Sequence, residues 1–188
     1  MSMRCQRRAA AVIAIGFLLA GALTACGTSA QQSPWPRLVT PGSGSGGVAA
    51  PTARPGVAYS FGAMQVCIGG PRGGVRIESV RPVAARGGLH VTAYGVWRPG
   101  TSTLGAAKVR LSSLKGFDAT REPTARCSEH RFDTIAVQVE KSTGGAASAT
   151  GFEVTYSSGG TMHSMRLPLG VALCARSSTR RTCRPPVP

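Results

Sequence analysis

Short segments in which apolar residues recur at every second position dominate the chain from residue 58 to residue 174. This period places alternate side chains on opposite faces of an extended backbone, as in a β-strand with one buried face. Glycine and proline pairs separate the segments, and this range of the sequence carries no helical stripe of apolar residues. We expect strands at 64–68, 74–80, 89–97, 107–114, 132–140, 152–157 and 162–173, with 107–114 the weakest of the seven.

Seven short strands within about 117 residues predict an all-β domain over residues 57–174. An antiparallel β-sandwich best accommodates strands of this length and spacing, and the immunoglobulin fold is one form of it. A small barrel is the alternative architecture.

Four cysteines fall in the predicted domain and its continuation, at Cys67, Cys127, Cys174 and Cys183. An even number of cysteines in an oxidising compartment indicates two disulfides, for which three pairings are possible. The short spacing of Cys174 and Cys183 favours a local loop between them, which leaves Cys67 to pair with Cys127. Zinc or redox chemistry is disfavoured because the chain has no Cys-x-x-Cys pair.

The N-terminal segment has the composition of an export signal. Three arginines and no acid occur within residues 1–8, and residues 9–20 are an unbroken run of small and apolar residues. The sequence Leu23-Thr24-Ala25-Cys26-Gly27 follows, and it resembles the lipobox of bacterial lipoproteins. An ordinary secretory signal, cut near Ala25 or Ala30 with Cys26 incidental, is the alternative.

The resemblance to lipoproteins implies a fate for each part of this segment. Residues 1–25 would be a signal peptide cut between Ala25 and Cys26, and the Cys26 thiol would carry a diacylglyceryl group. Two acyl chains give stable membrane attachment, whereas one anchors only marginally. We therefore expect a chain held on the outer face of the cytoplasmic membrane, with no cofactor apart from this covalent lipid.

Residues 26–56 are rich in glycine, serine and proline, most densely at 41–47. Such a composition buries too little apolar surface to offset chain entropy, so the sequence predicts a flexible linker. A coil of this length would separate its ends by about 30 Å. Trp35 and Leu38 within it are candidates for insertion into the lipid interface, or else an incidental apolar pair.

The charge of the chain is strongly positive. Removal of the signal peptide leaves 19 basic against 7 acidic residues, a formal charge of about +12. This excess suits anionic lipid, an anionic envelope polymer or an acidic envelope protein as a partner. Nucleic acid is disfavoured as a partner because no aromatic residues alternate with the basic ones. The basic residues are densest in the tail at 175–188, which ends in prolines.

A possible copper site is the pair His163 and Met165. Residues two apart on a strand point to the same face, where imidazole and thioether can both reach one copper ion. The pair resembles the His-x-Met element of periplasmic copper chaperones, but the other ligands of those proteins have no counterpart here. The structural alternative is that Met165 continues an apolar row that ends at Leu173.

An unrecognised hydrolase is a further alternative. Glu129, His130 and Asp133 cluster near Cys127, yet the sequence has no nucleophile elbow, zincin helix or phosphate loop to accompany them. Lys141-Ser142-Thr143-Gly144 is only vaguely similar to the Lys-Thr-Gly strand of penicillin-binding enzymes, whose Ser-Asp-Asn element is missing from the sequence. A polar turn before a strand explains the acidic cluster equally well.

The whole pattern of lipobox, tether and disulfide-bonded strands resembles small lipoproteins of actinobacteria. That group has no assigned activity, so the resemblance implies location and architecture but no catalytic residues. The leading hypothesis is a membrane-anchored, non-enzymatic module that binds a protein, wall polymer or lipid surface outside the cell. A copper-handling lipoprotein and a hydrolase are the two alternatives.

Overall fold

β-Strands account for nearly all regular structure in residues 34–42, 46–98, 107–179 and 182–187, the part of the chain that the computed structural model describes. These residues belong to the unit Gln32–Pro188. The strands are β1 (Arg37–Val39), β2 (Gly46–Ala50), β3 (Tyr59–Gly69), β4 (Val75–Val83), β5 (Leu89–Trp97), β6 (Phe117–Asp118), β7 (Asp133–Lys141), β8 (Ala147–Ala149), β9 (Gly151–Ser158), β10 (Thr161–Leu167) and β11 (Leu169–Leu173). Two single 3-10 turns, η1 (Leu111–Ser113) and η2 (Cys127–Glu129), join them.

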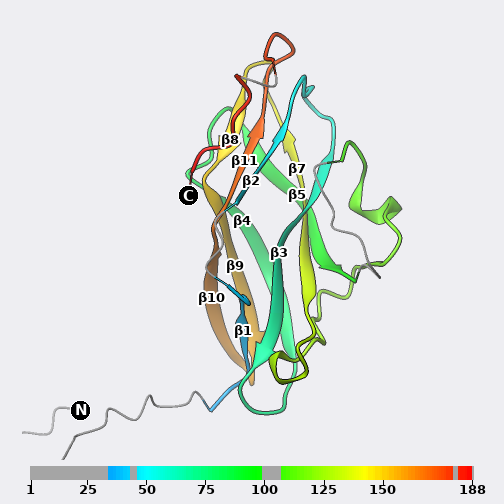
Figure 1. Ribbon diagram of the computed structural model, residues 1–188, viewed down its shortest axis with the longest axis vertical. Helices are drawn as coiled ribbons and strands as arrows, with labels where there is room; N and C mark the ends of the chain where they lie inside the picture. The colour runs from blue at the N-terminus through cyan, green and yellow to red at the C-terminus, as the bar shows by residue number, and fades with distance from the viewer. Residues whose placement is uncertain (1–33, 43–45, 99–106, 180–181, 188) are drawn as a thin grey trace, which may run out of the picture. The chain divides into compact units, whose positions relative to one another are not determined.

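The strands form a β-sandwich, as the alternation of the sequence predicts (Figure 1). One layer is a five-stranded sheet in the order β1-β3-β7-β5-β6, and the other contains the sheets β10-β9-β4 and β2-β11-β8. The rings of Phe61 on β3 and Phe152 on β9 lie 5.8 Å apart between the layers. Every strand pair is antiparallel except β2 with β11, which run parallel.

The strand order matches that of a constant immunoglobulin domain. Such a domain has seven strands, A to G, with A, B, E and D in one sheet and C, F and G in the other. If β1, β3, β4, β5, β7, β9 and β10 are taken as A to G, the order β1-β3-β7-β5 is A-B-E-D and the order β10-β9-β4 is G-F-C. The predicted sandwich is therefore confirmed, and its strand order is the immunoglobulin-like one.

The core lies between the two layers and is built from alternate residues of the strands. Ile135, Val137 and Val139 of β7 are fully buried there, as their spacing predicts. In β5 the alternation changes phase, because a bulge between Val91 and Ala93 shifts the register. After the bulge, Tyr94 and the even-numbered residues that follow it therefore face the core. The alternation in the sequence instead predicts that the Tyr94 side chain points away from the core.

The outer face of the five-stranded sheet is covered by the segment after residue 107. Leu111 is fully buried against Trp97 and Ala136, which point away from the main core. The side-chain amide of Gln138 accepts a hydrogen bond from the Leu111 N–H at 3.0 Å and fixes this segment in place. The predicted strand at 107–114 is thus wrong: this segment forms one isolated bridge at Ala107 and the turn η1.

The linker predicted over residues 26–56 is wrong for the described residues from 34 onward. β1 pairs with the end of β3, and β2 pairs with β11, so both strands are integrated into the sandwich. Leu38 is 6% exposed and lies in the main core, not in a position to enter lipid. Strand pairing to distant segments satisfies this Gly- and Pro-rich backbone, which local composition alone does not reveal.

The two disulfides have the pairing that the sequence favours. Cys67 bonds to Cys127 across 60 residues and joins β3 to η2. Cys174 bonds to Cys183 across nine residues and returns the C-terminal tail to the end of β11. The predicted strand 162–173 is divided at Pro168, where the chain passes from β10 to β11 and changes sheet. In the described segments no helix has the length and apolar character required to cross a membrane.

Candidate interaction surface

Four large hydrophobic side chains are exposed where several strand ends meet. Trp35 and Val39 are each 42% exposed, Phe132 is 39% exposed and Met162 is 57% exposed. The pairings of Val39 with Cys67, of Asp133 with Val66 and of Met162 with Ser157 place all four at the same end of the sandwich. Exposed apolar side chains that gather in this way are typical of interaction sites.

Trp35 is held by the turn between β9 and β10. A side chain on Gly159 would come within 2.2 Å of the Trp35 ring, and Gly159 has a positive φ of 56°, so glycine is required on both counts. The neighbouring Pro36 is buried, and its carbonyl oxygen accepts a hydrogen bond from the Ser158 hydroxyl at 2.7 Å. Trp35 is therefore fixed on one side while much of its ring faces outward.

A hollow of about 820 Å³ lies beside this ring. Its walls are Pro34, Trp35, Arg37 and Val39 together with the turn at residues 69–71. We call the exposed side chains of Trp35, Arg37 and Val39, with residues 70–72 of the adjacent turn, the Trp35 surface. It combines one aromatic ring, one branched aliphatic side chain and two arginines.

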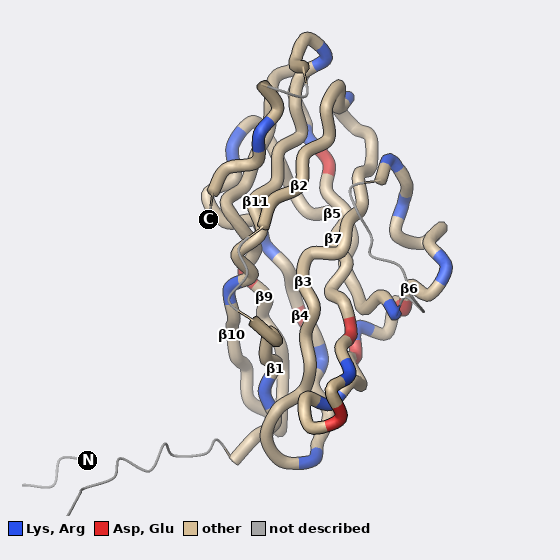
Figure 2. Tube along the Cα trace, in the orientation of Figure 1, with Lys and Arg blue, Asp and Glu red and all other residues tan. Residues whose placement is uncertain are grey.

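The Trp35 surface carries net positive charge. Arg37 and Arg72 are exposed, and the nearby Arg126 donates a hydrogen bond to the Pro71 carbonyl oxygen at 3.2 Å. Among the described residues no ion pair includes any of these three arginines. Figure 2 shows that acidic residues also occur toward this end, so the positive character belongs to the β1 side of it.

A second hollow, of about 480 Å³, is lined by the start of β4, the end of β9 and residues of the segment 122–126. The Arg76 guanidinium and the Glu122 carboxylate approach to 3.1 Å in its wall, and Glu78 lies 4.0 Å from Arg76. These acids offset the charge of Arg76, and Arg126 is the one other charged side chain among the described residues in the lining of this hollow.

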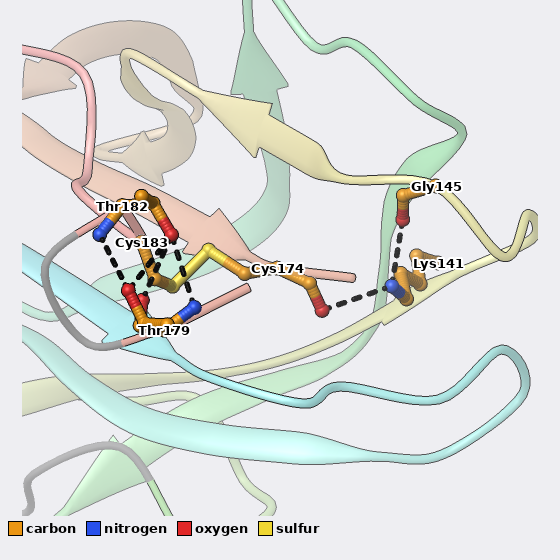
Figure 3. Close-up of a disulfide and its surroundings, with 6 residues drawn as sticks. All are labelled: Lys141, Gly145, Cys174, Thr179, Thr182 and Cys183. Atoms are coloured by element: carbon orange, nitrogen blue, oxygen red, sulfur yellow. Dashed lines mark hydrogen bonds between the residues drawn. A yellow bond between two sulfur atoms is a disulfide. The ribbon is translucent and has the colours of Figure 1, made fainter. Parts of the chain in front are cut away.

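Lys141, one residue beyond the predicted strand 132–140, is a buried cation that contacts Gly145 and Cys174 (Figure 3). It ends β7 and is 0% exposed, and its Nζ donates to the carbonyl oxygens of Gly145 at 2.7 Å and Cys174 at 3.2 Å. Burial lowers the pKa of Lys141 because the charged amine loses its hydration. Lys141 continues the alternate-residue row of Ile135, Val137 and Val139. Extending that row by one step would have predicted that the Lys141 side chain points inward.

The predicted cluster of Glu129, His130 and Asp133 does not converge. The buried Asp133 carboxylate accepts the backbone N–H groups of Thr124 and Ala125 at 2.6 and 2.9 Å, and the Arg98 Nε lies 3.4 Å from it. Glu129 instead pairs with Arg131 at 3.5 Å, and His130 is exposed. These contacts hold the segment before β7 against the sheet and give Asp133 a structural role.

His163 and Met165 lie on one face of β10, as their spacing predicts. The His163 ring stacks on Tyr156 of β9, with centroids 5.3 Å apart, and Met165 packs against the main core. The Nε2 atom of His163 is buried without a hydrogen-bond partner among the described residues. Within the same residues no group of three His, Cys, Asp or Glu side chains is arranged to hold a metal ion.

Ala25 and Cys26, the expected cleavage and lipidation sites, lie outside the described residues. No family model, curated protein or solved structure matches this chain.

Proposed function

We propose that this chain is a lipoprotein anchored to the outer face of the cytoplasmic membrane by a diacylglyceryl group on Cys26. Its β-sandwich is a non-enzymatic binding module of the cell envelope. The observation that carries the proposal is the order of three features: arginines in residues 1–8, an apolar run, and Leu23-Thr24-Ala25-Cys26-Gly27.

The disulfides support the proposal in two ways. Paired cysteines persist in oxidising compartments and are rare in the cytosol, so the two disulfides suit an exported domain. Cys67, Cys127, Cys174 and Cys183 pair among themselves, and Cys5 would leave with the signal peptide. Cys26 then remains the one thiol of the mature chain that is available for a lipid.

The Trp35 surface supports a role in binding. Its exposed aromatic and aliphatic side chains are kept in position by Gly159 and by the Ser158 hydrogen bond. The acids of the expected hydrolase cluster have structural partners instead, since Asp133 is occupied by Arg98 and two backbone N–H groups.

Metabolic labelling with a clickable palmitate analogue tests the anchor. We expect label on the wild-type chain and on Cys5→Ala, which removes the matched cysteine in the signal segment. We expect no label on Cys26→Ala, which should also keep the mass of the precursor because the peptidase requires the lipidated cysteine. Label on Cys26→Ala, or none on the wild type, would overturn the proposal.

A further inference from the structure

We propose that the Trp35 surface docks on an anionic phospholipid bilayer, so that the sandwich lies against the membrane that holds its anchor. This inference rests on the proposed function, because the lipid on Cys26 is what brings the domain to a membrane. Beyond the anchor, the inference names anionic lipid as the partner of the Trp35 surface. It also states which side of the domain faces the membrane.

The length of chain between the anchor and the sandwich limits where the domain can lie. The described structure begins at Pro34, only eight residues after Cys26, and Trp35 follows at once. At about 3.5 Å per residue, even a fully extended chain of eight residues spans at most about 28 Å. The start of the described structure therefore stays within about 28 Å of the anchored residue, which keeps β1 within reach of the headgroups.

The apolar side chains suit the boundary between water and hydrocarbon. Tryptophan is enriched at membrane interfaces because its ring is amphipathic, with an apolar body and one N–H donor. Trp35 presents such a ring beside Val39, and Met162 lies just beyond the turn that holds it. Because Gly159 and Pro36 fix this segment, insertion would cost little additional ordering of the backbone.

The charge of the surface selects anionic lipid. Arg37 and Arg72 are exposed and have no carboxylate partner among the described residues. Basic side chains next to a membrane are attracted by the negative surface potential of anionic lipid, and this attraction acts within about a Debye length. Arg37 lines the hollow beside Trp35, and Arg72 directly follows Pro71 in its wall, so charge and apolar contact would act at the same end of the domain.

A bilayer fits this surface better than a protein partner does. A stable protein interface needs roughly 800 Å² on each partner, with a close-fitting core. The Trp35 surface offers a few side chains around one open hollow. An anchored domain needs only weak additional contacts, because the tether keeps its local concentration at the membrane high.

Tryptophan fluorescence of the lipidated full-length protein in vesicles tests the inference. The chain has two tryptophans, and Trp97 is buried at 6% exposure, so it serves as an internal reference. With brominated acyl chains in phosphatidylglycerol vesicles we expect loss of Trp35 emission, and no such loss in Trp35→Phe, which retains only Trp97. In vesicles of pure phosphatidylcholine we expect a smaller loss.

Charge variants separate specific docking from general attraction. Arg37→Gln with Arg72→Gln should reduce the quenching, while Arg54→Gln with Arg86→Gln should leave it unchanged. The second pair makes the same change of charge in loops at the opposite end, beside the start of β3 and the start of β5. Equal loss in both pairs would overturn docking through the Trp35 surface.

The remaining outcomes are equally decisive. A protein that carries the palmitate label but shows no quenching of Trp35 would overturn the docking and leave the anchor intact. A protein without label would overturn both. A Trp35 shift on addition of anionic wall polymer, with no response to brominated lipid, would assign the surface to the wall.

Discussion

The Nζ of Lys141 lies 3.2 Å from the carbonyl oxygen of Cys174, so a buried amine ties the end of β7 to the residue that carries the second disulfide. The same carbonyl accepts the N–H of Ala53, which follows β2. Three segments that are distant in sequence therefore meet at one oxygen atom.

Lys141 should make stability increase with pH in the alkaline range. Burial lowers its pKa in the folded chain, whereas the unfolded chain has the ordinary value near 10.5. Between these two values the unfolded chain binds a proton that the folded chain lacks. The free energy of unfolding then rises with pH, by up to about 1.4 kcal/mol per pH unit.

Urea unfolding of the wild type and Lys141→Met across this range measures the difference, and the rise should be lost in the variant. Lys115→Met, a change at an exposed lysine, should keep the rise; a variant at Lys141 that also keeps it would contradict the prediction.

The two disulfides should differ in their contribution to stability. In the chain-entropy model the cost of removing a disulfide grows with the loop that it closes. We expect Cys67→Ser with Cys127→Ser to lower the free energy of unfolding by about 4 kcal/mol, and Cys174→Ser with Cys183→Ser by about 3 kcal/mol. Denaturant unfolding of the two double variants measures this order, and the reverse order would show that contacts of the tail, not loop closure, dominate.

His163→Phe should stabilise the domain. The aromatic ring can keep its stacking on Tyr156, while the buried Nε2 atom that lacks a hydrogen bond is removed. An unsatisfied buried polar atom costs about 1–3 kcal/mol, so we expect a gain near the lower end of that range. Thermal unfolding compares this variant with His90→Phe, a change at an exposed histidine whose ring nitrogen lies 3.0 Å from the Gly88 carbonyl oxygen. A lower melting temperature for His163→Phe would point to a role of the imidazole beyond stacking.

Asp118 should contribute to stability above its unfolded pKa and lose this contribution in acid. Hydrogen bonds from the Thr120 backbone N–H, then from the Thr120 side chain and from Arg98, lower the pKa of Asp118. Since the folded pKa is the lower one, stability falls as the pH drops from about 4 through the folded value. Asp118→Asn should lose less stability than the wild type between pH 5 and pH 2 in urea unfolding. Thr120→Ala, which keeps the backbone donor at 2.8 Å, should remove only part of the dependence. If Asp118→Asn keeps the full acid dependence, other carboxylates are responsible for it.

The sequence predicts strands best where burial alternates along a single segment. β5 has the predicted bounds, and β7 begins and ends within one residue of prediction, because turn residues border both strands. The facing of Tyr94 could not be predicted, since a bulge depends on the partner strand and leaves no local signal.

β1 and β2 escape a sequence-based prediction for a different reason. Their segment is rich in glycine and proline, and each strand is stabilised by pairing with residues far along the chain. The Trp35 surface depends on this pairing, so composition could suggest Trp35 as a lipid contact but could not place Arg37, Val39 and the 70–72 turn around it. Lys141 escapes because a lysine beside a Ser-Thr-Gly-Gly turn is ordinarily solvated.

The core-facing row of β7 begins with Asp133 and ends with Lys141, and both charges are buried with their own partners. A slip of β7 by one residue would turn Ile135, Val137 and Val139 to the outer face, which apolar patterning already forbids. A slip of two residues preserves that patterning, but it would draw one charge into the apolar row and separate the other from its partners. The two buried charges, one at each end of β7, therefore fix its register. Because β7 pairs with β3 and β5, they also fix the register of those two strands.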